Sequence, residues 1–190
     1  MPLRRLRDAS KTAPRTKCAP FFAPAVILVD FWSIVGGFSI DKTTIVDELR
    51  NAKDLNTLEI KNSFYSDSKN KHYILRGLNT SVLQLDDIGT QITIDSNTIN
   101  FITGHVIAVN PAGTVYSAKI ESAVFCDGVG AVSVLSSMTT VIKDDIPTGQ
   151  SWAISPLGAA NRFSYSTTRA GTTNIIKWIV STQVISIAWA

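Results

Sequence analysis

The chain has 190 residues, of which 45% are hydrophobic and 17% are charged. This composition excludes a wholly disordered chain and a coiled coil, because both are richer in charged residues. The length favours one compact domain with appendages, large enough to bury a core. The net charge of +3 is unevenly placed, since residues 1–20 carry +5 and the other 170 residues, with twelve basic and fourteen acidic side chains, carry −2.

Residues 1–20 are predicted to form a basic extended arm, because they combine that charge with three prolines and little apolar periodicity. We expect the arm to bind an acidic surface on a partner protein. Nucleic acid is the less favoured partner, since no aromatic residues alternate with the cations and no base-reading module is present. Contact with anionic lipid is a further alternative. The partner-binding positions of the arm are Arg4, Arg5, Arg7, Lys11, Arg15 and Lys17.

Residues 21–71 are predicted to hold an apolar docking segment, a short helix and a linker. The docking segment, residues 21–38, is interrupted by Pro24, Asp30 and two glycines, and so falls short of the roughly 20 apolar residues of a membrane span. We therefore favour a buried strand or docking segment over a membrane-associated segment or a targeting signal. Its docking positions are Phe21, Phe22, Ile27, Phe31 and Trp32.

Residues 41–55 carry the one good helical pattern, with Ile45, Val46, Leu49 and Ala52 at helical spacing and Asp41 as a candidate N-cap. This pattern predicts a short helix. The polar residues 62–71 that follow are typical of a linker.

From His72 onward the hydrophobic period changes to two, which predicts half-buried strands. Turn sequences such as Asn110–Gly113 and Asp127–Gly128 separate them. The predicted strands are 72–78, 81–85, 90–95, 98–109, 114–126, 131–143, 151–155, 160–167 and 173–189. Residues 72–190 are therefore expected to form an antiparallel β-sandwich with a jelly-roll-like form, which makes the chain mainly all-β.

The last predicted strand is apolar on both faces. Ile176, Trp178, Val180 and Val184 alternate along one face, and the other face carries Ile175, Ile179, Ile185, Ile187 and Trp189. A strand of this kind needs cover on both sides. We expect the second cover to come from residues 21–38 or from a neighbouring subunit.

No catalytic, cofactor-binding or metal-binding residue stands out in the sequence. His72 and His105 lack nearby ligand-type residues at metal spacing, and no nucleophile-type motif surrounds any serine. The pairs Asp86–Asp87 and Asp144–Asp145 precede turns, where aspartates commonly bind backbone N–H groups. We therefore predict a protein that is not an enzyme and that needs no cofactor.

Three further features have an ordinary structural interpretation. Gly128–Gly130 lacks the third glycine of a dinucleotide loop and is interpreted as a hairpin turn. Trp152, Tyr165 and Trp189 are expected in the core more often than on a stacking platform for sugars or bases. Cys18 and Cys126 have no metal-type spacing, and two reduced thiols are favoured over a disulfide.

The C-terminal half resembles a known class of β-rich module. The relevant stretches are 99–125, INFITGHVIAVNPAGTVYSAKIESAVF, and 152–183, WAISPLGAANRFSYSTTRAGTTNIIKWIVSTQ. They are similar to a module of tailed-phage tail-fibre and other virion surface proteins. That module usually has an Ala-Asp step and an Asn-Gly turn where this chain has residues 156–161. The matching positions are Gly104, Val106, Ile107, Ala108, Trp152, Asn161, Gly171, Ile176, Lys177 and Trp178.

This resemblance implies a structural role in a virion. A minor capsid protein of a large DNA virus with an internal membrane fits the same features. We expect the chain to pack as a minor capsid, cement or tail-surface component against other virion proteins, the major capsid protein among them. The rivals are a glycan-binding host-attachment module that uses exposed aromatics on the Trp152 and Tyr165 strands, and a membrane-associated structural protein anchored through residues 21–38.

Overall fold

The computed structural model describes residues 38–40, 43–46, 55 and 57–189. It divides into two compact units, Met1–Asp54 and Leu55–Ala190. Most of the described residues lie in the second unit. Its strands are β3 (Leu58–Asn62), β4 (Tyr65–Leu78), β5 (Ser81–Val82), β6 (Ile92–Thr93), β7 (Thr98–Val109), β8 (Val115–Cys126), β9 (Val132–Asp144), β10 (Ser151–Ala159), β11 (Arg162–Ala170) and β12 (Lys177–Ala188).

In the first unit the described residues form a two-stranded antiparallel sheet. Strand β1 (Phe38–Ile40) pairs with β2 (Thr43–Val46). The helix predicted over 41–55 is therefore wrong at residues 43–46. Four consecutive β-branched side chains, Thr43 to Val46, fit a pleated strand better than a helix, where their χ1 angles are restricted. The rest of that prediction, residues 47–54, lies outside the described residues.

The second unit contains a six-stranded antiparallel sheet with the order β3-β4-β12-β7-β8-β9. The last strand of the chain therefore lies between β4 and β7, whose paired residues precede it by 99–119 and 68–90 residues. Along β12, Trp178 pairs with Gly77 on β4 and with Ala108 on β7. This central position pairs both edges of β12 but covers only one of its faces, since Trp178 is 1% exposed and Ile185 is 49% exposed.

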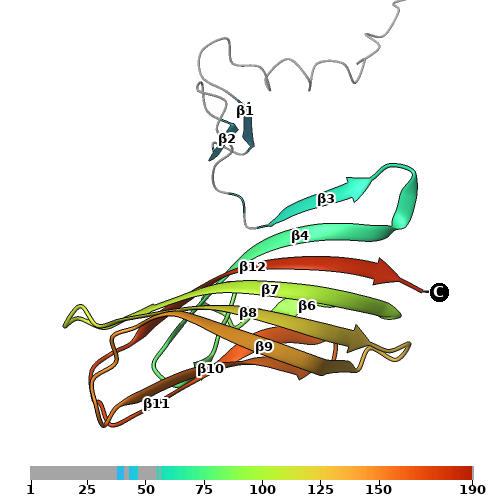
Figure 1. The fold of residues 1–190 in the computed structure, drawn as a ribbon. Coiled ribbons are helices and arrows are strands. Elements are labelled where there is room, and N and C mark those ends of the chain that lie inside the picture. The colour runs from blue at the N-terminus through green and yellow to red at the C-terminus, as the bar shows by residue number, and fades with distance from the viewer. Residues whose placement is uncertain (1–37, 41–42, 47–54, 56, 190) are drawn as a thin grey trace, which may run out of the picture. The chain divides into compact units, whose positions relative to one another are not determined.

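A second sheet has the order β10-β11-β5, and β6 also pairs with β11. Figure 1 shows the two sheets as separate layers, with β10 and β11 against one side of the larger sheet. The prediction of an all-β antiparallel sandwich is confirmed. The narrower jelly-roll form gains no support from this strand order, since β7, β8 and β9 follow one another as plain hairpins.

The core lies between the two sheets and is built from alternate residues of their strands. Trp178 is 1% exposed, and its indole packs edge-to-face against Tyr116 and Trp152, with ring centroids 6.2 and 6.4 Å away. Its Nε1–H donates a hydrogen bond to the carbonyl of Asn79 at 2.9 Å. Phe163 and Tyr165 of β11 complete the aromatic part of the core.

In two of the predicted turns, a side-chain oxygen accepts hydrogen bonds from backbone N–H groups of the turn. The Oδ1 atom of Asn110 accepts hydrogen bonds from the N–H groups of Ala112 and Thr114, both at 3.0 Å. Asp127 does the same for Val129 and Ala131 in the β8–β9 turn. These side chains replace strand pairing where the chain reverses. The hairpin interpretation of Gly128–Gly130 agrees with this geometry.

The sheet begins earlier than the sequence analysis placed it. Residues 62–71, predicted as a linker, include the end of β3 and the first half of β4, and the boundary predicted at residue 72 falls inside β4. These residues are polar, so their composition shows no apolar alternation that would predict a strand. Next to them, Glu59 forms ion pairs with Lys61 and Lys71, both at 2.7 Å. These pairs hold the pKa of Glu59 down at about 2.

Tyr165 connects the two sheets at the centre of the sandwich. It is fully buried, and its hydroxyl lies directly over Gly104 of β7. Burial raises the pKa of Tyr165 to about 12, an effect partly opposed by the Thr182 hydroxyl. The folded state therefore disfavours the tyrosinate.

This pKa shift predicts a loss of stability at alkaline pH. Since the folded pKa of Tyr165 is raised, its contribution is complete below the unfolded pKa of about 10 and is lost as the pH rises towards 12, up to roughly 3 kcal/mol. Urea unfolding between about pH 9 and 11 should show a steeper loss for the wild type than for Tyr165→Phe. Equal slopes would contradict the burial effect. The variant retains Tyr73 and Tyr116, whose pKa values burial also raises, so the difference isolates Tyr165.

Candidate functional site

The six-stranded sheet has an outer face, defined here as the side turned away from the core. Ten apolar side chains on this face are between 39% and 55% exposed. Clusters of exposed apolar side chains of this kind are typical of contact surfaces. The ten are Leu58, Ile60, Ile74, Ile99, Phe101, Ile107, Ile179, Ile185, Ile187 and Trp189.

Strand register gathers many of these side chains at one end of the outer face. On β12 and β7, Ile187 lies opposite Ile99, and Ile185 lies opposite Phe101. The next strand adds Phe125, which is the partner of Ile99 and stacks on Trp189 with ring centroids 4.9 Å apart and planes 6° apart. We call this group the apolar patch. It consists of Ile60, Ile99, Phe101, Phe125, Ile185, Ile187 and Trp189.

Two open hollows lie at or near the apolar patch. One has a volume of about 310 Å³ and is lined by residues of β7, β8 and β9, including Phe101, Ala123 and Met138. The other, of about 430 Å³, is lined by residues of β3, β4 and β12, including Ile60 and Ile185. The first hollow therefore borders the apolar patch at Phe101, and the second lies within the patch, over β4 between Ile60 and Ile185.

Beyond the apolar patch, the middle of the outer face is polar. Thr103 and Gln183 lie opposite each other there, and His105 lies opposite Lys119 on the neighbouring strand. The Lys119 ammonium forms an ion pair with Glu121 at 2.9 Å. The charged groups of this region are thus partly neutralised within the chain itself.

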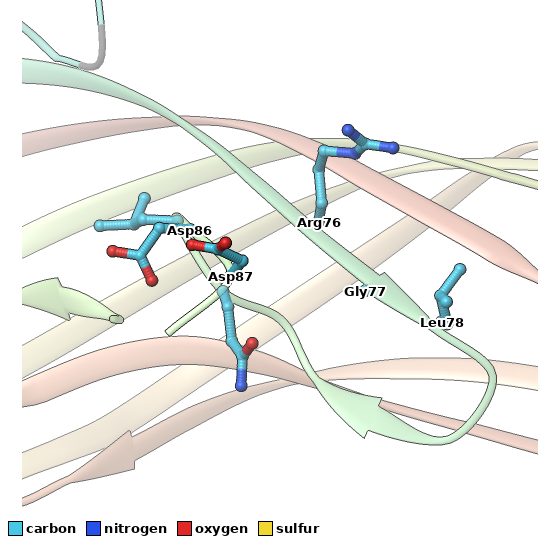
Figure 2. A pocket seen from close by; sticks show the side chains of 7 residues that line it. Arg76, Gly77, Leu78, Asp86 and Asp87 are labelled. Atoms are coloured by element: carbon cyan, nitrogen blue, oxygen red, sulfur yellow. The ribbon is translucent and has the colours of Figure 1, made fainter. Parts of the chain in front are cut away.

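A separate pocket of about 470 Å³ lies where β4 ends and the β5–β6 loop begins. Figure 2 shows the Asp86 and Asp87 carboxylates on one side of it, with the Arg76 guanidinium pointing away from them. Asp86 accepts hydrogen bonds from the N–H groups of Ile88 at 3.1 Å and Thr90 at 2.9 Å. Hydrogen bonds lower the pKa of Asp86. The largest contribution comes from the Thr90 side chain, and the next comes from the Thr90 N–H group. Asp86 therefore closes a turn, as its position before Ile88–Gly89 predicted.

The two histidines lie on the outer face but on strands that β12 separates. His72 is opposite Gln183, and His105 is opposite Ser181. Within the described part of the chain, no group of three or more His, Cys, Asp and Glu residues could hold a metal ion. Asp144 accepts a hydrogen bond from the N–H of Ile146 at 3.0 Å, again as a turn residue.

The aromatic residues weighed as a stacking platform do not lie together on the surface. Trp152 is 5% exposed, and Tyr165 is fully buried. A sugar-binding platform on these two residues is therefore wrong, because their rings fill the core. Trp189 is the exception among the three, since it lies half-exposed on the outer face against Phe125.

Cys126 is a buried free thiol at the end of β8. Burial raises its pKa, with a smaller contribution from the Asp127 charge. A buried thiol of raised pKa is a poor nucleophile. Cys18 lies outside the described residues.

The positions predicted for the arm and the docking segment also lie outside the described residues. The structure therefore leaves residues 1–20 and most of 21–38 as predictions from sequence. Among the residues that are described, no helix is long and apolar enough to cross a membrane.

Sequence reasoning found only part of the outer face. It identified Ile179, Ile185, Ile187 and Trp189 on the second face of β12, and these residues are indeed uncovered by the described sandwich. It missed Ile99 and the other contributors from β7 and β8. A signal was present, because β7 also has apolar residues on both faces.

No protein-family model matches the chain, and no curated protein matches it. Two solved structures contain a similar segment. One is the tailspike protein gp49 of Acinetobacter baumannii bacteriophage Fri1, a capsular polysaccharide depolymerase, with 9% sequence identity and a TM-score of 0.38 over 68% of this chain and 20% of that chain. The other is the tailspike protein of Acinetobacter baumannii phage AM24, with 11% identity and a TM-score of 0.30 over 63% of this chain and 26% of that chain.

This chain thus spans 20% and 26% of the two tailspike proteins that it matches. The prediction that it is not an enzyme is corrected here. The gp49 tailspike is a depolymerase and therefore an enzyme, which contradicts that prediction. At TM-scores of 0.38 and 0.30, we take neither an activity nor a substrate from these proteins.

Proposed function

We propose that the protein is a structural component of a virus particle, held among other virion subunits through the outer face of its six-stranded sheet. The observation that carries this proposal is the row of half-exposed apolar side chains on that face. An apolar surface of this extent is typical of a contact surface. The sequence resemblance of residues 99–125 and 152–183 to a virion surface module supports the same class of role.

Covering the outer face supplies the main attractive free energy in this proposal. A half-exposed isoleucine such as Ile185 has about 90 Å² of apolar area to bury, worth on the order of 2 kcal/mol at about 25 cal/mol per Å². Several such side chains are needed, because association also costs translational, rotational and side-chain entropy. The clustered apolar patch provides them within one contact area.

The basic residues 1–20 form a second part of the proposal. Their net charge of +5 would attract an acidic surface on a neighbouring subunit, such as the major capsid protein. Attraction of this kind weakens as salt screens the charges. The arm would therefore contribute orientation and rate of association, and the outer face would contribute strength.

A glycan-binding role is not carried forward on Trp152 and Tyr165, because both residues are buried. The membrane-anchored alternative depends on residues 21–38, most of which lie outside the described residues. The proposed function therefore rests on the half-exposed apolar side chains of the outer face.

The test measures how much of the protein enters particles. Virions would be produced in cells that supply the wild type, Phe101→Lys, Ile88→Lys or a chain lacking residues 1–20, and the protein in gradient-purified particles would be quantified by mass spectrometry. We expect Phe101→Lys to reduce incorporation about tenfold or more, because a charge in the apolar patch opposes burial. The arm deletion should cause a smaller loss, and this loss should shrink as salt rises, because salt screens the attraction that the arm provides.

Ile88→Lys is the matched control. Ile88 is 87% exposed on the loop between β5 and β6, so the substitution adds the same charge away from the six-stranded sheet, and incorporation should remain at the wild-type level. Two results would contradict the proposal. One is absence of the wild-type protein from purified particles, and the other is undiminished incorporation of Phe101→Lys.

A further inference from the structure

We propose that strand β9 pairs with β9 of a second copy of this chain, in the antiparallel direction and about a two-fold axis at Met138. The pair would join two six-stranded sheets edge to edge. This inference goes beyond the proposed function, because it concerns an edge of the sheet and not its outer face. It rests on three features of β9: an open edge, a lack of charge and a pattern of side chains that is the same in both directions.

The far edge of β9 has no strand beside it in the described chain. Strand β9 is the last in the order of the six-stranded sheet, and there it pairs with β8. Within the described chain, residues 133–143 make no backbone hydrogen bond outside that pairing. Residues 135–145 are also all exposed. An edge of this kind presents a row of backbone N–H and C=O groups to another extended strand.

The exposed part of β9 lacks the charges that usually protect an edge strand. Residues 132–142 contain no charged side chain and no proline. Four large apolar side chains in this stretch are between 51% and 66% exposed: Leu135, Met138, Val141 and Ile142. The opposite edge strand, β3, has only five residues and carries Glu59 and Lys61. Charges and short strands prevent edge-to-edge pairing, so β3 is protected in this way and β9 is suited to a partner.

The side chains of β9 match those of a second copy in the antiparallel direction. Around Met138 the strand has two hydroxyl residues on each side, and apolar residues follow them in both directions. The facing pairs would be Met138 with Met138, Ser136 with Thr140, and Ser137 with Thr139. Serine and threonine side chains that face each other across two strands stabilise a sheet. A two-fold contact uses the same surface on both copies, so it requires a strand that matches itself.

Two bulges in β9 set the limits of this contact. Leu135 and Ile142 have no partner on β8, and the β8–β9 register shifts at each of them. Between them, residues 136–141 pair with β8 one by one. Bulges twist an edge away from a partner, so the regular stretch between the two bulges is the part of β9 that can accept a strand.

Pairing in this register keeps the outer faces of the two copies on the same side of the joined sheet. Met138 lies opposite Glu121 on the outer face, and Ser136 and Thr140 share that face because side chains alternate along a strand. Facing residues of antiparallel strands lie on the same side of a sheet. The apolar patches of both copies therefore stay open to other contacts.

Sedimentation velocity of the full chain tests the proposal. The wild type should form a reversible dimer within about 10–500 μM, the range expected for a contact smaller than a standard interface. Met138→Lys and Met138→Glu should each raise the dissociation constant about tenfold or more, because two like charges then meet on the axis. An equimolar mixture of these two variants should recover association, since lysine then faces glutamate. Circular dichroism verifies that each protein is folded.

Two control variants separate the β9 edge from other surfaces. Phe101→Lys adds the same charge within the apolar patch, and Ile88→Lys adds it on the exposed loop between β5 and β6. Both should leave the dissociation constant of the dimer unchanged.

A wild type that stays monomeric up to about 500 μM would overturn the proposal. So would association that both Met138 variants leave intact, because the contact would then lie elsewhere on the chain. A mixture that associates no better than either variant alone would also overturn it. None of these results bears on the virion role, which is tested by the incorporation of Phe101→Lys into particles.

Discussion

Replacing Trp178 by alanine is expected to lower the free energy of unfolding by about 3–5 kcal/mol. Trp178 is almost completely buried on the central strand β12, where its ring packs against Tyr116 and Trp152. The substitution opens a cavity between the two sheets. It also removes the indole donor to the Asn79 carbonyl, although that carbonyl retains the hydroxyl of Thr167 at 2.8 Å.

Urea unfolding followed by circular dichroism measures this loss, and Ile179→Ala is the matched control. Ile179 is the next residue on the same strand, but it lies on the outer face and is 39% exposed. Its truncation should cost less than about 1.5 kcal/mol in the unassembled protein, because less apolar area leaves water on folding. Similar losses for the two variants would contradict the assignment of the inner and outer faces.

The second large effect is expected for Gly104→Ala, at about 1–3 kcal/mol of destabilisation. A β-carbon at Gly104 would overlap the Tyr165 hydroxyl and would lie 2.8 Å from the Cζ atom of that ring and 3.0 Å from Val180 Cγ1. Alanine is otherwise tolerated better than glycine in a strand. The loss is therefore a measure of how tightly Tyr165 is held between the sheets.

A double-mutant cycle separates this contact from other effects of the substitution. In a Tyr165→Leu background the ring is gone, and the added cost of Gly104→Ala should fall below about 1 kcal/mol. Thermal or urea unfolding of the four proteins gives the coupling free energy. If Gly104→Ala costs the same in both backgrounds, Tyr165 is not the residue that requires glycine at this position.

The sequence predicts most strands of the sandwich because period-two alternation and turn chemistry agree there. Strand β7 has the predicted bounds of 98–109, and β8 and β9 lie within one residue of the prediction. Asn110 and Asp127 mark the ends of these strands by capping the turns with their side chains. Local residues determine such features, so a local analysis finds them.

Features that depend on distant residues were missed. Residues 65–71 are strand because they pair with β3 and β12, and their polar side chains give no sign of it. Residues 43–46 are a different case, because their four β-branched residues and their pairing with the adjacent β1 are local features that the helical spacing outweighed in the prediction. The insertion of β12 between β4 and β7 likewise has no signature in the residues of β12 alone.

The candidate site shows the same division. The two-faced pattern of β12 predicts an uncovered apolar surface, and the structure has that surface among the described residues. The apolar patch itself arises from register, which places Phe101 beside Ile185 and Phe125 under Trp189. No residue of β7 or β8 indicates these neighbours by itself. Composition thus predicts that a contact surface exists, and pairing determines where it lies.

The central claim is that the outer face is a contact surface in the assembled particle. Hydroxyl-radical labelling measures this directly by comparing purified particles with the isolated protein at low concentration. The account predicts that Phe101, Ile185 and Trp189 are protected several-fold in particles, whereas Ile88 is labelled equally in both samples. Labelling of Phe101, Ile185 and Trp189 that is as strong in particles as in the isolated protein would contradict it.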